Sequence, residues 1–338
     1  MTACIPASIT RFLASATLAT CLGATGLAQA QQKPAGLPGN YPSKPVRILI
    51  SAAPGGGADY SGRTVFSKLG ERWGATFIPD NSMAGAGGLI AMEAGAKAAP
   101  DGHTLLITSG STYIAATFTG KFEFDTRKAY SPIAQFTTGA VLVGAYPGEP
   151  YNDLKGMIAH ARANPGKLSY GATGVGSSLH LTGELIQYMA GIKMQHIPYK
   201  GTGQSVIDLL AGRLNLVIGS TTALVPHVRA GKVKTIGITA ASRLPSIPEQ
   251  PTLAEMGLPG FDYTSWFGVV GPAGMNPAIV NALNAEINRI LGTPELIRMF
   301  LDQGTDLMTG TTEQFRDTIL STLDKTEKVL KATGLKFE

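Results

Sequence analysis

The chain has 338 residues, of which 44% are hydrophobic and 15% are charged, and its formal net charge is +5. This length is sufficient for two lobes that each bury their own core. The positive charges are spread along the chain, so nucleic acid is not an expected partner, whereas small anions are plausible ones. Because its two cysteines, Cys4 and Cys21, lie close to the N-terminus, neither disulfides nor cysteine-bound metals are expected in the rest of the chain.

Residues 1–30 predict a secretory signal peptide. Arg11 is the sole charged residue, an apolar stretch follows from Phe12 to Leu27, and Ala28-Gln29-Ala30 forms a small-x-small cleavage site. The alternatives are a membrane anchor, for which the stretch is short and interrupted by Ser, Thr and Gly, and a lipoprotein signal at Cys21, which Thr20 fits poorly. No later apolar run approaches the length of a membrane span, so we expect an exported, soluble and periplasmic protein.

Downstream of the leader, strand-like and helix-like segments alternate, which is typical of an α/β fold with a parallel sheet covered by helices on both faces. Two long helices are expected to close the chain, capped by Asn276 and by Thr311 or Thr312. The expected strands are Val46 to Ala53, Thr76 to Pro79, Thr104 to Thr108, Ala140 to Ala145, Leu168 to Ala172, Met194 to Pro198, Leu214 to Ile218, Lys234 to Thr239 and Trp266 to Gly271. The expected helices are Tyr60 to Trp73, Leu89 to Lys97, Leu154 to Ala163, His180 to Met189, Ser205 to Ala211, Ala223 to Ala230, Pro277 to Leu291 and Thr312 to Ala332.

The order of these segments predicts two α/β lobes with a ligand cleft between them. Lobe 1 is expected to be discontinuous, comprising residues 31–143 and 266–338, and lobe 2 to comprise residues 144–265. The chain is expected to cross between lobes near Ala140 to Tyr146 and near Ser265 to Val269. Four prolines between Ser242 and Phe261 favour a surface connection there rather than a core element.

A glycine-rich loop follows the first expected strand and leads into a helix: Pro54-Gly55-Gly56-Gly57-Ala58-Asp59, with Tyr60 next. Glycine allows a close approach of bare backbone N–H groups to a ligand, and the helix dipole favours an anion such as a carboxylate. Asp59 is itself acidic, so it is expected to cap the helix, bind a ligand amine or orient water. Taken alone, such a loop is equally compatible with a simple chain turn.

A second loop of the same design follows the strand that ends at Ala172, and it carries Gly176, Ser177, Ser178 and His180. Two helix N-termini in the two halves of the chain could hold one anion between them. Further strand ends offer donors, although each also fits an ordinary capped turn or a solvated side chain. These further candidates are Ser109, Ser111 and Thr112, then Tyr199 and Lys200, then Ser220 and Thr221.

Motifs of known enzyme classes are missing from the sequence, including G-x-S-x-G, S-x-x-K, H-E-x-x-H and the phosphate-binding P-loop. No pair of histidines has a compelling metal-ligand spacing, so neither a metal nor a cofactor is expected. The alternative is a secreted hydrolase or isomerase that uses His180 with Ser177 or Ser178, for which no third, orienting group is identifiable. A structural or signalling protein that binds no small molecule is a third possibility. The residue inventory favours binding without turnover.

At these residues the sequence resembles the substrate-binding proteins of tripartite tricarboxylate transporters, the Bug family of periplasmic receptors. The resemblance runs from Tyr41 to the C-terminus. It implies a two-lobed, Venus-flytrap periplasmic binding fold of type II-like architecture, a carboxylate held by the two glycine loops and helix N-termini, and two integral membrane subunits as partners. The receptor is expected to be a monomer. It is carried by Pro54 to Asp59 with Arg63, Gly85 to Gly88, Ala98 to Gly102, Gly176 to Leu181, His196 to Gly201 and Ser265 to Gly268.

Two departures from the family pattern bear on the ligand. Asn81-Ser82-Met83-Ala84 stands where the family has Asn-Arg-Pro, and Leu89 stands where Asn is common. Together with Tyr60, Leu89 suggests a more apolar wall, which favours an aromatic dicarboxylate such as terephthalate. The alternative is that Tyr60 and Leu89 pack inside the lobe and the ligand is an aliphatic di- or tricarboxylate.

Overall fold

The computed structural model describes residues 37–334, apart from residues 53, 56, 86, 87, 120, 121, 175, 176, 200 and 303. The expected leader at residues 1–30 therefore lies outside the described residues. The described strands are β1 (Val46–Ile50), β2 (Phe77–Asp80), β3 (Thr104–Ser109), β4 (Tyr130–Ala145), β5 (Ser169–Thr173), β6 (Gln195–Tyr199), β7 (Leu216–Ser220), β8 (Lys234–Ile238), β9 (Thr264–Pro272) and β10 (Asp306–Leu307). The helices are η1 (Pro38–Asn40), α1 (Gly57–Trp73), α2 (Leu89–Lys97), α3 (Gly110–Phe118), α4 (Leu154–Ala163), α5 (Ser178–Ala190), α6 (Thr202–Leu210), α7 (Thr221–Arg229), α8 (Pro277–Leu291), α9 (Pro294–Leu301) and α10 (Thr312–Thr333).

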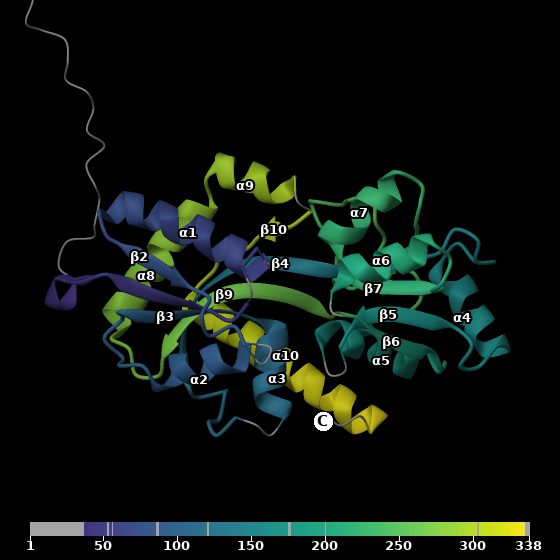
Figure 1. Ribbon diagram of the computed structural model, residues 1–338, viewed down its shortest axis with the longest axis horizontal. Helices are drawn as coiled ribbons and strands as arrows, with labels where there is room; N and C mark the ends of the chain where they lie inside the picture. Colours follow the sequence, from purple (N-terminus) through teal and green to yellow (C-terminus); the bar gives the residue numbers. More distant parts are fainter. Residues whose placement is uncertain are drawn as a thin grey trace, which may run out of the picture.

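The strands form one mixed sheet in the order β2-β1-β3-β9-β4-β7-β5-β6, with β8 and β10 also paired to β4. Parallel pairs lie at the two ends, and β9 and β4 run antiparallel to their neighbours in the middle. In Figure 1, β4 and β9 extend through the centre of the molecule and join its two halves. We call the half with β1, β2, β3 and β9 lobe 1, and the half with β5 to β8 lobe 2.

The long strand β4 belongs to both lobes. It pairs with β9 up to Ala140 and with β7 from Val141 onward. Two register shifts, between Pro132 and Ala134 and between Gln135 and Thr137, interrupt its pairing with β9. Proline and bulged positions weaken the alternating pattern by which a strand is recognised in a sequence. For this reason only the second part of β4 was expected from the sequence.

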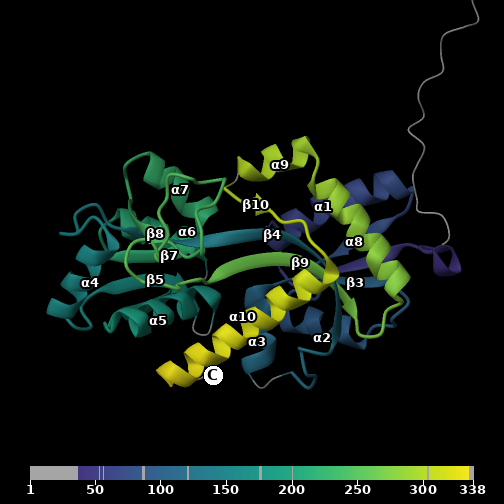
Figure 2. The ribbon, with the colours of Figure 1, turned by 180° about the vertical axis from the view of Figure 1, so that it is seen from behind.

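Local sequence signals place most helices correctly. Thr311 and Gln314 form a complete capping box at α10, and Asn276 caps α8 ahead of Pro277. Helix α3 was not expected, because Thr, Tyr, Ile and Phe favour strands, and α9 and β10 were also missed. Helix α10 runs diagonally across the molecule from lobe 1 to α5 of lobe 2 (Figure 2).

The segment from Ser242 to Phe261 corrects one expectation. It is irregular, as its prolines predict, but it is no mere surface connection, because Leu244, Ile247, Leu253 and Phe261 are almost completely buried in the core of lobe 2. Prolines exclude regular pairing without excluding burial of the residues between them.

No helix in the described ranges is both long and apolar enough to cross a membrane.

Candidate functional site

A cavity of about 540 Å³ lies between the lobes, where β4 changes partners and β9 begins. Its walls come from the starts of helices in both lobes, from the centre of β4, from β9 and from the α9–β10 region. The lining residues are Gly55, Gly57, Tyr60, Ser61, Ser111, Thr137, Gly139, Ala140, Val141, Thr173, Ser177, Ser178, Leu179, Ser220, Thr221, Ser265, Trp266, Phe267, Phe300 and Thr305.

In the described part of the chain, four helices begin at this cavity, two from each lobe. They are α1 and α3 in lobe 1 and α5 and α7 in lobe 2. Each follows a strand of the sheet, α3 and α7 directly and α1 and α5 after a loop. The N–H groups of a first helical turn have no partner within the helix, and the helix dipole adds partial positive charge there. The arrangement therefore favours a bound anion held from both sides.

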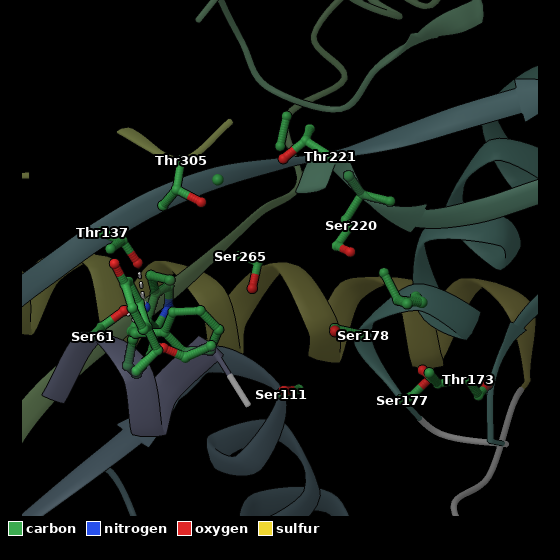
Figure 3. A pocket seen from close by; sticks show the side chains of 18 of the residues that line it. Ser61, Ser111, Thr137, Thr173, Ser177, Ser178, Ser220, Thr221, Ser265 and Thr305 are labelled. Atoms are coloured by element: carbon green, nitrogen blue, oxygen red, sulfur yellow. Dashed lines mark hydrogen bonds between the residues drawn. The ribbon is translucent and has the colours of Figure 1, made fainter. Parts of the chain in front are cut away.

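The cavity wall carries hydroxyl side chains along its length and aromatic side chains on the lobe 1 side. In Figure 3, Ser61 and Thr137 lie at one end, Thr173 and Ser177 at the other, with Ser111, Ser265 and Ser178 between them. Tyr60, Phe267 and Phe300 add aromatic surface from lobe 1, and the Tyr60 and Phe300 ring centroids are 5.5 Å apart. The described lining residues include no Lys, Arg, Asp or Glu, so the donors they offer to an anion are neutral.

Gly57 lies close to the Phe267 ring. A Cβ atom at this position would lie 2.7 Å from the Phe267 ring, which is closer than real Cβ contacts. The glycine thereby allows β9 and the start of α1 to meet at the cavity wall.

The structure brings part of the sequence-derived candidate set to the cavity. Gly57, Tyr60, Ser111, Ser177, Ser178, Ser220 and Thr221 line it. Gly56, Gly176 and Lys200 lie outside the described residues. Ala58, Asp59, Ser109, Thr112, His180 and Tyr199 are not among the lining residues: Ala58 is buried in α1, Ser109 caps α3 by accepting from the Thr112 N–H, and the Tyr199 hydroxyl donates to Asp208.

The Asp59 carboxylate stabilises the first glycine loop by hydrogen bonding. Its carboxylate accepts hydrogen bonds from the Gly55 N–H at 2.9 Å, from Arg63 Nε at 2.7 Å and from Asn81 Nδ2 at 2.9 Å. Burial opposes ionisation, but these bonds lower the pKa of Asp59 below its ordinary value. With its oxygens occupied in this way, Asp59 fits the loop-stabilising role better than that of a partner for a ligand amine.

Among the described residues, the His180 ring does not form the hydrogen bond to a serine hydroxyl that a serine nucleophile needs. The bond that joins it to Ser177 runs from the His180 backbone N–H to Ser177 Oγ at 3.2 Å. The His180 ring stacks on His196 at 4.1 Å, and its Nε2 lies 3.5 Å from Glu184, whose pKa this contact lowers. Ser177 Oγ donates to the Thr173 carbonyl, so neither partner is arranged as a nucleophile and base.

Several lining residues were not predicted from the sequence. Ser61, Thr137, Ser265, Phe267, Phe300 and Thr305 come from a helix interior, the middle of the sheet and the α9–β10 region. Only the stretch from Ser265 to Gly268 carried a sequence signal, as part of the family resemblance. No group of three or more potential metal-ligating side chains occurs within the described ranges.

Comparison with known proteins assigns the chain to a family. The profile described as "Tripartite tricarboxylate transporter family receptor" matches residues 62–335. The chain belongs to this receptor family. Receptors of the tripartite tricarboxylate transporter family are solute-binding proteins rather than enzymes, and membership implies a periplasmic location and a transporter as partner.

Relatives of the tripartite tricarboxylate transporter receptor described here cover nearly all of it. Protein BugT of Bordetella pertussis is 31% identical, over 88% of this chain and 92% of its own length. The solved structure "R. palustris Rpa4515 with adipate" is 29% identical, with a TM-score of 0.76 over 88% of this chain and 99% of that one. The structure of MatC from Rhodopseudomonas palustris with bound malate is 28% identical, with a TM-score of 0.72 over 86% of this chain and 100% of that one. The α/β periplasmic binding fold expected from the sequence is confirmed, including its Venus-flytrap arrangement.

Proposed function

We propose that this receptor captures one small carboxylate in the cavity between its lobes and delivers it to a transporter with two integral membrane subunits. The observation that carries the proposal is that, among the described elements, four helix N-termini, two from each lobe, converge on a cavity whose described lining residues carry no charge. A ligand that touches both lobes stabilises the closed arrangement by its additional contacts, which couples capture to a change of shape.

For the ligand we propose a dicarboxylate with an apolar body, with an aromatic one such as terephthalate favoured over aliphatic di- and tricarboxylates. Tyr60 and Phe267 are half-buried at the cavity wall and offer ring surface. Leu89, in contrast, packs against the core of lobe 1 and contributes no described surface to the cavity. The solved relatives with adipate and malate support the dicarboxylate class without distinguishing its members.

The cavity chemistry also disfavours amino acids. An amino-acid ligand carries an ammonium group, which needs a nearby anionic side chain when it is desolvated. Among the described lining residues there is none, and the oxygens of Asp59 are occupied by the loop.

For the cellular setting we propose export by the signal peptide at residues 1–30 and a monomeric receptor in the periplasm. We also propose that the receptor has no hydrolase or isomerase activity, because His180 is buried against His196 and Glu184. Nucleic acid, metals and cofactors have no place in this proposal.

Isothermal titration calorimetry of the purified protein with terephthalate, adipate, malate and aspartate tests the proposal. We expect one site per chain, the tightest binding for terephthalate, no binding of aspartate, and every titrated ligand recovered unchanged. Absence of heat for all three dicarboxylates would overturn the receptor assignment. Product formation that disappears in His180→Ala would replace it with the enzyme hypothesis.

A further inference from the structure

The cavity hydroxyls are not equivalent as donors to a ligand. A hydroxyl has a single hydrogen to donate, and an ionised carboxylate can only accept. A hydroxyl whose hydrogen already bonds a protein oxygen must give up that bond before it can donate to a bound acid. The existing hydrogen bonds of the cavity wall therefore indicate which hydroxyls are available.

Several of these hydroxyls are engaged within the protein. Ser61 donates to the Gly57 carbonyl at 2.7 Å, and Thr221 donates to the Gly304 carbonyl at 2.9 Å. Thr173 donates to Ser177 Oγ at 2.8 Å, and Ser177 donates to the Thr173 carbonyl. These groups hold the helix starts and the α9–β10 region in place.

Four other hydroxyls have no hydrogen-bond partner within the described ranges. They belong to Tyr60, Ser178, Ser265 and Thr305, which all line the cavity and are half-buried. We call them the unpaired hydroxyls. They come from α1, from the first residue of α5, from β9 at the lobe junction and from the turn before β10. Their donors are therefore distributed around the cavity.

The Tyr60 side chain combines a donor with a rigid apolar face. Its ring packs on Phe300, which is 1% exposed and fixes Tyr60 from behind. Phe267 lies on the neighbouring wall against Gly57. An apolar ligand body can contact these rings while its acid group reaches the Tyr60 hydroxyl.

We propose that the unpaired hydroxyls select the ligand, and that the ligand carries one acid group at each end. One acid group lies at the start of α5, where Ser178 Oγ adds to the first-turn N–H groups; the other lies at lobe 1, where Tyr60 and Thr305 donate. The assignment rests on the proposed function and refines it, because it names the residues that separate a diacid from a monoacid.

Calorimetry with terephthalate and its monoacid counterpart benzoate tests the assignment, using wild type, Tyr60→Phe, Ser178→Ala and Ser61→Ala. Tyr60→Phe keeps the ring and removes only the hydroxyl. We expect Tyr60→Phe and Ser178→Ala each to weaken terephthalate binding about tenfold or more, the usual effect of removing a hydrogen bond to a charged group. Ser61→Ala should weaken terephthalate binding less than Tyr60→Phe or Ser178→Ala does, because the Ser61 hydroxyl already donates to the Gly57 carbonyl. For benzoate, only Ser178→Ala should lose affinity.

Melting temperatures without ligand separate this role from a structural one. Tyr60→Phe and Ser178→Ala should melt like wild type, because neither lost hydroxyl has a hydrogen-bond partner among the residues that the structure describes. A fall in melting temperature that accompanies the affinity loss would contradict the assignment, as would equal losses for Ser61→Ala and Tyr60→Phe. If wild type binds adipate and not terephthalate, the same variants are compared with adipate and hexanoate.

The outcomes keep the two proposals apart. Wild type that binds a diacid while both variants keep its affinity would overturn the hydroxyl assignment and leave the receptor function intact. Wild type that binds neither terephthalate nor adipate, nor malate, would overturn both.

Discussion

At the scale of single residues, the polar side chains near the cavity divide into those that build the wall and those that face it. Asp59 and Arg63 pair with each other and both bond Asn81, and the Asp59 carboxylate also accepts from the Gly55 N–H of the glycine loop. His196 lies behind α5 in a stack with His180 and Tyr170, at ring distances of 4.1 Å and 5.2 Å. Its Nε2 is buried and has no hydrogen-bond partner among the described residues.

The His196 stack makes stability depend on pH. Burial, followed by the neighbouring His180, lowers the pKa of His196 to about 4, compared with about 6.5 in the unfolded chain. Below pH 6.5 the unfolded chain therefore binds a proton that the folded chain does not bind until pH 4. The free energy of unfolding should fall as the pH drops from about 6.5 to about 4.

Urea denaturation at pH 7.5, 5.5 and 4.5 measures this dependence, with His196→Gln as the comparison. The Glu184 carboxylate, which faces His180, and the Tyr170 hydroxyl bonded to it stay in place in the variant. Between pH 6.5 and 4, the free energy of unfolding should fall less steeply with decreasing pH in His196→Gln than in the wild type. An unchanged slope would show that other groups cause it.

At the scale of elements, the α9–β10 region forms a side connection between the lobes. Thr221 of α7 donates to the Gly304 carbonyl, and Ser246 donates to the Asp306 carboxylate from both its hydroxyl, at 2.6 Å, and its backbone N–H, at 3.2 Å. Asp306 and Ser246 are 7% and 8% exposed. The same region supplies Phe300 and Thr305 to the cavity, so the contact helps to fix the cavity wall.

Ser246→Ala should lower the free energy of unfolding by about 1–3 kcal/mol, because a buried carboxylate oxygen loses its hydroxyl donor. Ser242→Ala provides a matched control: Ser242 is exposed in the same segment and should change stability by less than about 0.5 kcal/mol. Urea denaturation at pH 7.5 compares the two. Equal effects would indicate that the Ser246 hydroxyl bond adds nothing to stability.

At the scale of the whole molecule, the two lobes share one sheet and one continuous strand. Strand β4 pairs with β9 in lobe 1 and with β7 and β8 in lobe 2. Helix α10 adds a second bridge, since Leu330 packs against the lobe 2 core and Lys325 forms an ion pair with Asp262. Neither lobe can lose its structure without exposing surface of the other.

Differential scanning calorimetry should accordingly show a single unfolding transition. A bound diacid should shift the whole transition to a higher temperature. At a hundredfold excess over its dissociation constant, the ligand should raise the free energy of unfolding by about 2.7 kcal/mol. Two transitions, of which the ligand moves one, would mean that the lobes fold independently and that the ligand touches a single lobe.

The sequence by itself determined the local features: the alternation of strands and helices, the caps of α8 and α10, and the two glycine loops that begin α1 and α5. Each depends on residues a few positions apart, so periodicity and capping rules suffice. These features, with the family resemblance, were enough to predict an anion site between two lobes.

Only the tertiary structure decided which side chains face the cavity and which are occupied elsewhere. The Thr221 hydroxyl donates to the carbonyl of Gly304, 83 residues away in the chain, and the Tyr60 ring packs against the Phe300 ring. Strand pairing at the sheet centre brings Thr137 and Ser265 to the wall, and the buried Ser246 binds the Asp306 carboxylate. Contacts of this separation leave no periodic trace in the sequence, because they arise when distant segments pack together.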